Sequence, residues 1–250
     1  MSNQAFSIKP EPAMLQKQLS SDPAEDLWAL VPAKKLAEAK RRLASCLGAE
    51  REALTIAMFR DVIAALHCSE EVSRIMVVTG DPQLAIIAKQ QDILVLEENG
   101  SIGLNEAIDL GINEIRKLGG RRIAILPTDI PLLTGAEFDR VVRDYNHQTH
   151  NRDQDLIGIN ACTDRSGTNC LFINTQQSFT LRYGPGSYKL HSDSAEKQEY
   201  GPVQLHSITL SMDIDEQQDL NALLSYCELN PEFQKTETWN LLHNIKYNLM

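Results

Sequence analysis

Apolar runs and amphipathic segments alternate along the first half of the chain. The apolar runs are typical of buried strands, and they fall at residues 27–31, 74–79, 92–96 and 121–126. Apolar residues at helical spacing predict helices between these runs, over residues 50–66, from Asp81-Pro82 onward and over residues 103–118. Strands that alternate with helices form a mainly parallel sheet with helices on both faces. We therefore predict a single three-layer α/β domain.

The pattern loosens in the second half. Predicted strands at residues 155–160 and 169–173 flank a polar loop, and residues 203–212 predict one or two further strands. Residues 215–226 predict a helix, and the apolar residues after Pro231 predict a terminal helix that docks on the core or on a partner subunit. A homodimer is therefore left open.

The two ends of the chain differ from its centre. Residues 1–26 are rich in Ser, Gln, Pro and acidic residues without a sustained period, so we expect a flexible extension. We place the folded domain at residues 27–226 and a helical tail at residues 227–250. No run of about 18 apolar residues occurs and the first residues lack the apolar core of a signal peptide, so we expect a cytoplasmic protein with no membrane partner.

Composition excludes several kinds of site. The five cysteines are widely spaced and form no C-x-x-C motif, which favours reduced thiols over disulfides or a zinc site. His147 and His150 lie in a polar segment typical of a loop, and a metal site there is a minor alternative. The formal net charge of −10 argues against nucleic acid as a partner. A small anionic substrate would need a local cluster of cations.

The segment after the first predicted strand supplies such a cluster. Lys34, Lys40 and Arg42 follow Pro32 closely enough to converge on a chain of phosphates at the carboxyl end of the strand. The alternative is a basic helix face that only meets solvent.

Three aspartates stand at positions where a carboxylate would be held in place. Asp129 lies between Pro127 and Pro131 just after a predicted strand, which fits either a turn or a ligand for Mg²⁺. Asp213 and Asp215 share one face of an extended segment, where their charges repel unless a cation lies between them. The alternative is that Asp215 caps the next helix and Asp213 is exposed.

Two glycine-containing loops complete the candidate chemistry. Gly167 precedes Thr168, and Gly184 and Gly186 precede Ser187, which begins a predicted helix. Glycines and a helix N-terminus let backbone N–H groups approach an anion. Residues 100–105 contain further glycines, but they do not form the G-x-G-x-x-G fingerprint of dinucleotide-binding folds.

In combination, these motifs resemble the 2-phospho-L-lactate guanylyltransferase family of coenzyme F-420 biosynthesis, over about residues 28–224. The matching motifs are W-A-L-V-P-x-K at 28–34, K-x-R-L at 40–43, G-L-N at 103–105, P-T-D-I-P-L-L at 127–133, D-R-S-G-T-N at 164–169, Y-G-P-G-S at 183–187 and D-I-D at 213–215. This sequence departs from the family's pattern at Cys170, where a small Ala is common, at the doubled basic position Lys35 and in its N-terminal extension.

The resemblance implies a nucleotidyltransferase fold, similar to that of the nucleotide-diphospho-sugar transferases, that transfers GMP from GTP to a phosphorylated acid. It implies Mg²⁺ as the cofactor, held by Asp129, Asp213 and Asp215. It implies three further groups of site residues: a catalytic group of Lys34, Lys40, Arg42 and Asp129; a nucleotide-binding group of Pro32, Lys34, Lys40, Arg42, Gly103 and Asn105; and an acid-binding group of Thr168, Gly184 and Ser187.

The implied reaction needs no general base, because the phosphate of the acid is already ionised at neutral pH. Family members use 2-phospho-L-lactate, phosphoenolpyruvate or 3-phospho-D-glycerate, and the product passes to a deazaflavin-transferring enzyme. Asp81 and Glu97, at predicted strand ends, are candidates for reading the guanine base, although surface caps fit them as well. The alternatives are a sugar-phosphate or molybdopterin-type nucleotidyltransferase and a non-catalytic nucleotide-binding module.

Overall fold

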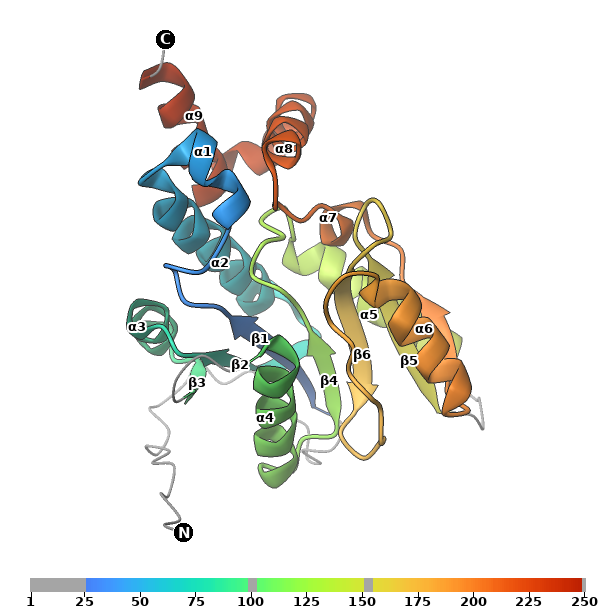
Figure 1. The fold of residues 1–250 in the computed structure, drawn as a ribbon. Coiled ribbons are helices and arrows are strands. Elements are labelled where there is room, and N and C mark those ends of the chain that lie inside the picture. Colours follow the sequence, from blue (N-terminus) through green and yellow to red (C-terminus); the bar gives the residue numbers. More distant parts are fainter. Residues whose placement is uncertain (1–25, 99–102, 151–154, 249–250) are drawn as a thin grey trace.

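The computed structural model describes residues 26–98, 103–150 and 155–248. In this part of the chain, seven strands form one sheet in the order β3-β2-β1-β4-β6-β5-β7 (Figure 1). The strands are β1 (Leu27–Ala33), β2 (Val72–Thr79), β3 (Leu94–Glu97), β4 (Arg122–Ile125), β5 (Leu156–Ala161), β6 (Thr168–Asn174) and β7 (Gly201–Gln204). The extension predicted at residues 1–26 and the glycine segment at 100–102 lie outside the described residues, apart from Asp26.

The sheet is mainly parallel, as the sequence predicts. β1 pairs in parallel with β2 and β4, and β2 pairs in parallel with β3. β6 runs antiparallel to both of its neighbours, β4 and β5, while β7 is parallel to β5. The carboxyl ends of β1, β2 and β4 therefore lie at one edge of the sheet, where parallel α/β folds bind ligands.

Helices cover both faces of this sheet because β1 alternates its side chains between two apolar cores. Ala29 and Val31 pack with α2 (Glu50–Cys68), α3 (Pro82–Gln90) and α5 (Gly135–Thr149). Trp28 and Leu30 pack on the opposite face with α4 (Leu104–Lys117) and α6 (Ser187–Lys197). The predicted three-layer arrangement is confirmed.

A third apolar cluster joins the C-terminal elements to the domain. It contains Leu54 and Met58 of α2, Leu223 of α8 (Gln217–Leu229) and Trp239 of α9 (Glu237–Asn248). The short helices η1 (Arg41–Leu43), α1 (Ala44–Leu47) and η2 (Pro231–Lys235) lie beside it. The terminal helix thus docks on the core through α2, and the boundary expected at residues 226 and 227 falls inside α8.

The structure extends the first strand beyond its predicted end. β1 continues through Pro32, which lies opposite Val78 of β2. Leu30 accepts a hydrogen bond from Leu126 N on the β4 side, so the backbone nitrogen of Pro32 points the same way, past the end of β4. The pairing of β1 with β4 ends at Leu30 and Ile125, so Pro32, which has no N–H to donate, lies where this ladder stops.

One other local prediction was right only in part, and another was wrong. Residues 203–212 contain the end of β7 and then the short helix α7 (Ile208–Ser211), which begins because Ser207 Oγ accepts a hydrogen bond from Leu210 N at 3.2 Å. His147 lies in α5 rather than in a loop.

None of the helices in the described ranges combines the length and the apolar character that a membrane span requires.

Candidate active site

Lys40 joins two of the candidate aspartates at the carboxyl edge of the sheet. Its Nζ is hydrogen-bonded to Asp129 and lies 2.7 Å from Asp215 Oδ1. Only 8% of the Lys40 side chain is exposed. The backbone of Lys40 is left-handed, with φ 49°, a conformation that costs a non-glycine residue about 1 kcal/mol or more. The basic segment is therefore not simply a solvated helix face.

The segment that carries Asp213 and Asp215 returns beside Asp129, as the sequence predicts. Ile214 N donates a hydrogen bond to Asp129 O at 3.0 Å, and the Ile214 side chain is buried in the third apolar cluster. Asp215 does not cap α8. Instead, Glu216 and Asp219 form the capping box of that helix, which leaves the Asp215 carboxylate to Lys40.

The three carboxylates have different electrostatic surroundings. Burial and, after it, the charge of Asp129 together raise the pKa of Asp213 to about 6, although the hydrogen bond from Asn169 acts to lower it. Burial alone would also raise the pKa of Asp215, but the charge and hydrogen bond of Lys40 hold it below its usual value. Lys40 itself has a raised pKa, because the two carboxylates outweigh its burial. Excess negative charge thus remains at Asp213.

A buried side chain of β6 and an exposed one in the loop after β5 fix the position of Asp213. Asn169 Nδ2 donates to Asp213 Oδ1 at 3.0 Å and to Leu210 O at 2.9 Å. Thr163 Oγ1 donates to Ser211 O at 2.8 Å. These contacts hold the α7 segment against the sheet, so Asn169 is a positioning residue, a role that we did not predict for it from the sequence. Its place beside Thr168 in the G-T-N motif was the available signal.

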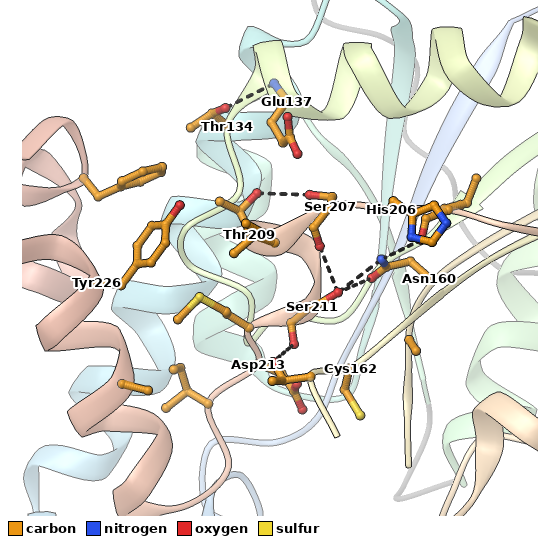
Figure 2. Close-up of a pocket in the computed structure, with 18 of the residues that line it drawn as sticks. Thr134, Glu137, Asn160, Cys162, His206, Ser207, Thr209, Ser211, Asp213 and Tyr226 are labelled. Atoms are coloured by element: carbon orange, nitrogen blue, oxygen red, sulfur yellow. Dashed lines mark hydrogen bonds between the residues drawn. The ribbon is translucent and has the colours of Figure 1, made fainter. Parts of the chain in front are cut away.

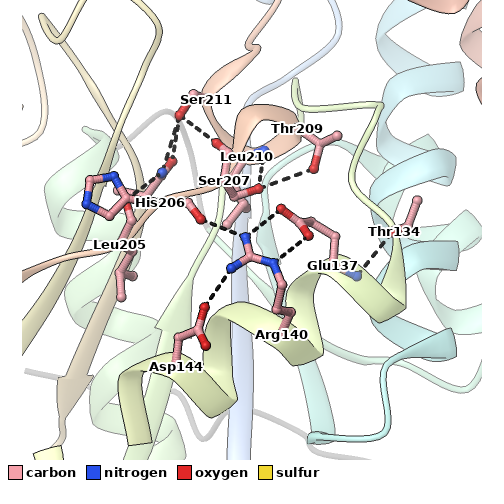
Figure 3. A network of polar contacts seen from close by, with 11 residues as sticks. Thr134, Glu137, Arg140, Asp144, Leu205, His206, Ser207, Thr209, Leu210 and Ser211 are labelled. Atoms are coloured by element: carbon pink, nitrogen blue, oxygen red, sulfur yellow. Dashed lines mark hydrogen bonds and ion pairs between the residues drawn. The ribbon is translucent and has the colours of Figure 1, made fainter. Parts of the chain in front are cut away.

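A second set of contacts holds the same segment to α5 (Figure 3). Arg140 Nη2 donates to His206 O at 2.7 Å and to Glu137 Oε1 at 2.8 Å, and Arg140 Nη1 donates to Asp144 Oδ2 at 2.6 Å. The turn between β7 and α7 is therefore fastened to a helix of the core. This fastening limits the movement of the backbone that leads to Asp213.

A cavity of about 1000 Å³ lies next to this segment, between α5, α7 and α8 (Figure 2). Asp213, Cys162 and Asn160 line one side, and Tyr226 lines another. The loop predicted to bind the acid contributes no described residue to its lining. The cavity therefore lies beside the carboxylate Asp213, but it does not include the residues predicted to bind the acid.

The residues predicted to bind the acid lie around the N-terminal half of α6. Thr168 is buried at the start of β6, and its Oγ1 lies 3.0 Å from Nδ1 of His191. Ser187 is buried one helical turn before His191, on the same face of α6. Gly184 and Gly186 have φ values of 136° and 74°, which glycine adopts without strain. Thr168, Ser187 and the glycine loop are therefore brought together.

The residues predicted to bind the nucleotide are less uniformly placed. Lys34 is exposed after β1, and Arg42 pairs with Glu216 at 2.9 Å at the surface. Gly103 precedes the first residue of α4. The amide of Asn105 is bonded to the backbone of Tyr183, donating to its O at 3.1 Å and accepting from its N at 2.8 Å. In this structure Asn105 holds the segment of residues 182–186 that is predicted to bind the acid, called the acid loop below. A contact of Asn105 with nucleotide stays a prediction.

Both candidate readers of guanine already have partners. Asp81 accepts hydrogen bonds from Gln83 N and Leu36 N, at 2.9 Å each, and so caps α3 and ties down the basic segment. Glu97 forms a surface ion pair with Lys89. The structure therefore favours the capping alternative for Asp81.

A match to a family model decides the family of this chain. Residues 27–248 fit the family model described as "Guanylyl transferase CofC like", which spans the sheet, the carboxylates and the acid loop. The chain belongs to this family. The predicted family resemblance is confirmed, and the CofC-like domain extends through α9.

Several relatives carry guanylyltransferase names. The phosphoenolpyruvate guanylyltransferase of Conexibacter woesei is 31% identical over 199 residues, covering 78% of this chain and 86% of that protein. The 2-phospho-L-lactate guanylyltransferase of Methanobrevibacter smithii is 27% identical over 226 residues, covering 90% of this chain and 93% of that protein.

Solved structures share the fold of this CofC-like chain. A Desulfovibrio desulfuricans protein described as a nucleotide-diphospho-sugar transferase has a TM-score of 0.68 at 17% identity, covering 88% of this chain and 95% of its own. A cytidylyltransferase from Leptospira borgpetersenii has a TM-score of 0.56 at 14% identity, covering 89% of this chain and 94% of its own. At these identities the likeness concerns the fold alone, and it confirms the predicted nucleotidyltransferase architecture.

Proposed function

We propose that this protein transfers GMP from GTP to a small phosphorylated acid and releases pyrophosphate. The observation that carries the proposal is the meeting of Lys40 with Asp129 and Asp215 beside Asp213, at the sheet edge where α/β folds bind ligands. The names of the relatives support guanylyl transfer to phosphoenolpyruvate or 2-phospho-L-lactate. We extend the proposed substrates to 3-phospho-D-glycerate, which the sequence resemblance also implies.

The reaction exchanges one phosphorus–oxygen bond for another. A phosphate oxygen of the acid bonds to the α-phosphorus of GTP, the bond to the bridging oxygen breaks, and pyrophosphate leaves with the electron pair. The attacking phosphate is already ionised, so the chain's task is to hold the two anions in line and to neutralise charge. Lys34, Lys40 and Arg42 would contact the triphosphate, while Thr168 and the first turn of α6 would contact the acid.

We propose Mg²⁺ as the cofactor, held by Asp129, Asp213 and Asp215. Carboxylate oxygens are the donors that Mg²⁺ prefers, and the raised pKa of Asp213 indicates negative charge without a partner cation. When bound, the ion neutralises the triphosphate and the leaving pyrophosphate. Within the described ranges, no three His, Cys, Asp or Glu side chains are grouped to hold an ion as they stand. Lys40 lies between two of the carboxylates, so we propose that its ammonium and the ion compete for them.

The surface lysine gives a test of the basic segment. Lys34→Ala should lower kcat/KM by about 10- to 150-fold, which is the expected loss of one charge-assisted hydrogen bond to a phosphate. Stability should barely change, because the side chain is exposed. Steady-state kinetics of Lys34→Ala measure this loss. The matched control is Lys117→Ala, which removes an exposed lysine paired with Glu114 on α4. Kinetics equal to that control would favour a solvated surface residue.

A side-by-side assay tests the proposed function. Purified protein is given Mg²⁺ and GTP with each of the three acids, and both pyrophosphate and the mass of the product are measured. We expect one acid to give a guanylylated diphosphate, with preference for a three-carbon acid phosphorylated at carbon 2, and GTP to be used in preference to ATP. A strong preference for 3-phospho-D-glycerate would overturn the choice of acid, and equal use of ATP would overturn the choice of base. No turnover with any acid would overturn the function.

The product links the proposal to coenzyme F-420. A guanylylated acid carries an activated diphosphate, and we propose that a deazaflavin-transferring enzyme consumes it. A homodimer also stays a proposal.

A further inference from the structure

His191 lies between the two parts of the predicted acid site. His191 belongs to α6, and its ring is wholly buried. Nδ1 lies 3.0 Å from Thr168 Oγ1, and Nε2 lies 2.9 Å from the backbone nitrogen of Arg182. One imidazole thus touches both the Thr168 hydroxyl and the loop that leads to Gly184 and Ser187.

The contact with Arg182 determines the tautomer of the ring. A backbone N–H can only donate, so Nε2 must accept and carries no hydrogen. Burial, followed by the charge of Arg182, lowers the pKa of His191 to about 4, so the ring is neutral near pH 7. In a neutral imidazole with a bare Nε2, the hydrogen is on Nδ1.

The tautomer in turn determines the direction of the Thr168 hydroxyl. Nδ1–H donates to Thr168 Oγ1, which therefore acts as an acceptor in this contact. The hydroxyl's own hydrogen is then directed away from the ring and can be donated to an anion. A threonine that accepts from a fixed donor presents its hydrogen in a narrower range of directions than a free rotor does.

The same ring also holds the backbone of the acid loop. Arg182 N is bonded to His191, and the next residue, Tyr183, has both backbone groups bonded to Asn105. The Tyr183 ring packs edge-on against His191 with centroids 4.8 Å apart. The chain is thus fixed just before Gly184, where the left-handed turn into α6 begins.

We propose that His191 is a positioning residue for the phosphorylated acid, which orients the Thr168 hydroxyl as a donor and fixes the loop carrying Gly184 and Ser187. The inference rests on the proposed function, because it takes the first turn of α6 as the acid subsite. The ring contacts no substrate and transfers no proton.

Matched variants separate this role from that of a core histidine. Gln can place its carbonyl oxygen near Nε2 and keep the Arg182 contact, but it lacks the Nδ1 donor. Asn places its amide nitrogen near Nδ1 and keeps the donor to Thr168. We expect His191→Gln to raise KM for the acid severalfold, because the Thr168 hydroxyl then rotates freely and its hydrogen bond to the acid is weakened, with about tenfold as the limit if that bond were lost altogether. His191→Asn should raise it less, and KM for GTP should stay within about twofold in both.

A double-mutant cycle with Thr168 completes the test. If His191 acts through the hydroxyl, Thr168→Val alone should raise KM for the acid, and adding His191→Gln should raise it little more. Thr168→Ser, which keeps the hydroxyl, should raise KM for the acid less than Thr168→Val does. The proposal would be overturned if the effects of Thr168→Val and His191→Gln on KM for the acid multiplied in the double variant. It would also be overturned if folded His191→Gln changed KM for the acid and KM for GTP equally, or left KM for the acid unchanged.

An NMR measurement makes the test independent of activity. In protein with ¹⁵N-labelled histidine, His191 should show a protonated Nδ1 and a bare Nε2 at pH 7. The opposite tautomer would overturn the proposal even if a variant failed to fold. Absence of turnover in the wild type with every acid would instead overturn the proposed function, so the two failures are distinguishable.

Discussion

Asp213→Asn is expected to abolish guanylyl transfer and yet to stabilise the metal-free protein. Transfer should fall by about 10³-fold, because a carboxylate proposed to neutralise the reacting phosphates through Mg²⁺ is lost. Stability should rise because burial and the charge of Asp129 lift the pKa of Asp213 to about 6. Relative to its usual value of 3.8, that shift corresponds to roughly 3 kcal/mol against the ionised folded state. Burying the new amide offsets part of this, so we expect a gain of about 1–2 kcal/mol.

The sign of the pH dependence follows from the raised pKa. Above pH 6 the folded protein contains the unfavourable carboxylate, and between pH 6 and pH 4 the carboxyl group takes up its proton in the folded state first. The advantage of Asp213→Asn should therefore be largest at pH 8 and shrink on acidification. Urea unfolding in EDTA at pH 8 and pH 5 measures it, with Asp193→Asn as the control, at a partly exposed position on α6 where Asp193 pairs with Lys189. A variant less stable than the wild type at pH 8 would contradict this expectation.

Lys40→Met should abolish transfer and destabilise the metal-free protein. Met keeps most of the chain length but leaves Asp129 and Asp215 without their shared cation. Removing one partner of a buried ion pair costs about 3–5 kcal/mol, and we expect roughly 2–3 kcal/mol here because Asp215 is 53% exposed and partly screened by water. Transfer should fall by about 10²- to 10³-fold.

The response of this variant to Mg²⁺ gives a second measurement. If the Lys40 ammonium and the ion compete for the same carboxylates, Mg²⁺ should raise the Tm of Lys40→Met by more than that of the wild type. Lys117→Met, which removes an exposed ion pair on α4, should respond as the wild type does. Equal Mg²⁺ shifts in all three proteins would exclude the competition, and wild-type activity in Lys40→Met would exclude its catalytic role.

Much of the fold could be predicted because apolar runs and helical spacing report burial directly. β1, β2 and β4 lie where their apolar runs predict them, and Asp81 caps α3. α5 was not predicted because its outward face is strongly polar, although Phe138 and Val142 recur at helical spacing on its buried face. α7 is too short for any period to reveal it.

Only part of the candidate site could be predicted, because some of its contacts follow from the path of the backbone and others from side chains of distant segments. The meeting of Asp213 with Asp129 could be predicted from the path of the backbone, because the late segment returns along the edge where β4 ends. The insertion of Lys40 between carboxylates depends on its left-handed backbone, which no local signal predicts for a lysine. The roles of Asn169 and His191 depend on side-chain hydrogen bonds between distant segments. Such contacts follow from the tertiary structure and not from local sequence.

The central claim is that the carboxylates beside Lys40 form the metal and nucleotide centre of a guanylyltransferase. Crystals soaked with Mn²⁺, which shares the oxygen preference of Mg²⁺, and with a non-hydrolysable GTP analogue test it through anomalous scattering. The account predicts an anomalous peak coordinated by carboxylate oxygens of Asp129 and of at least one of Asp213 and Asp215, with the α-phosphate beside it. An ion and triphosphate bound away from these aspartates would contradict it.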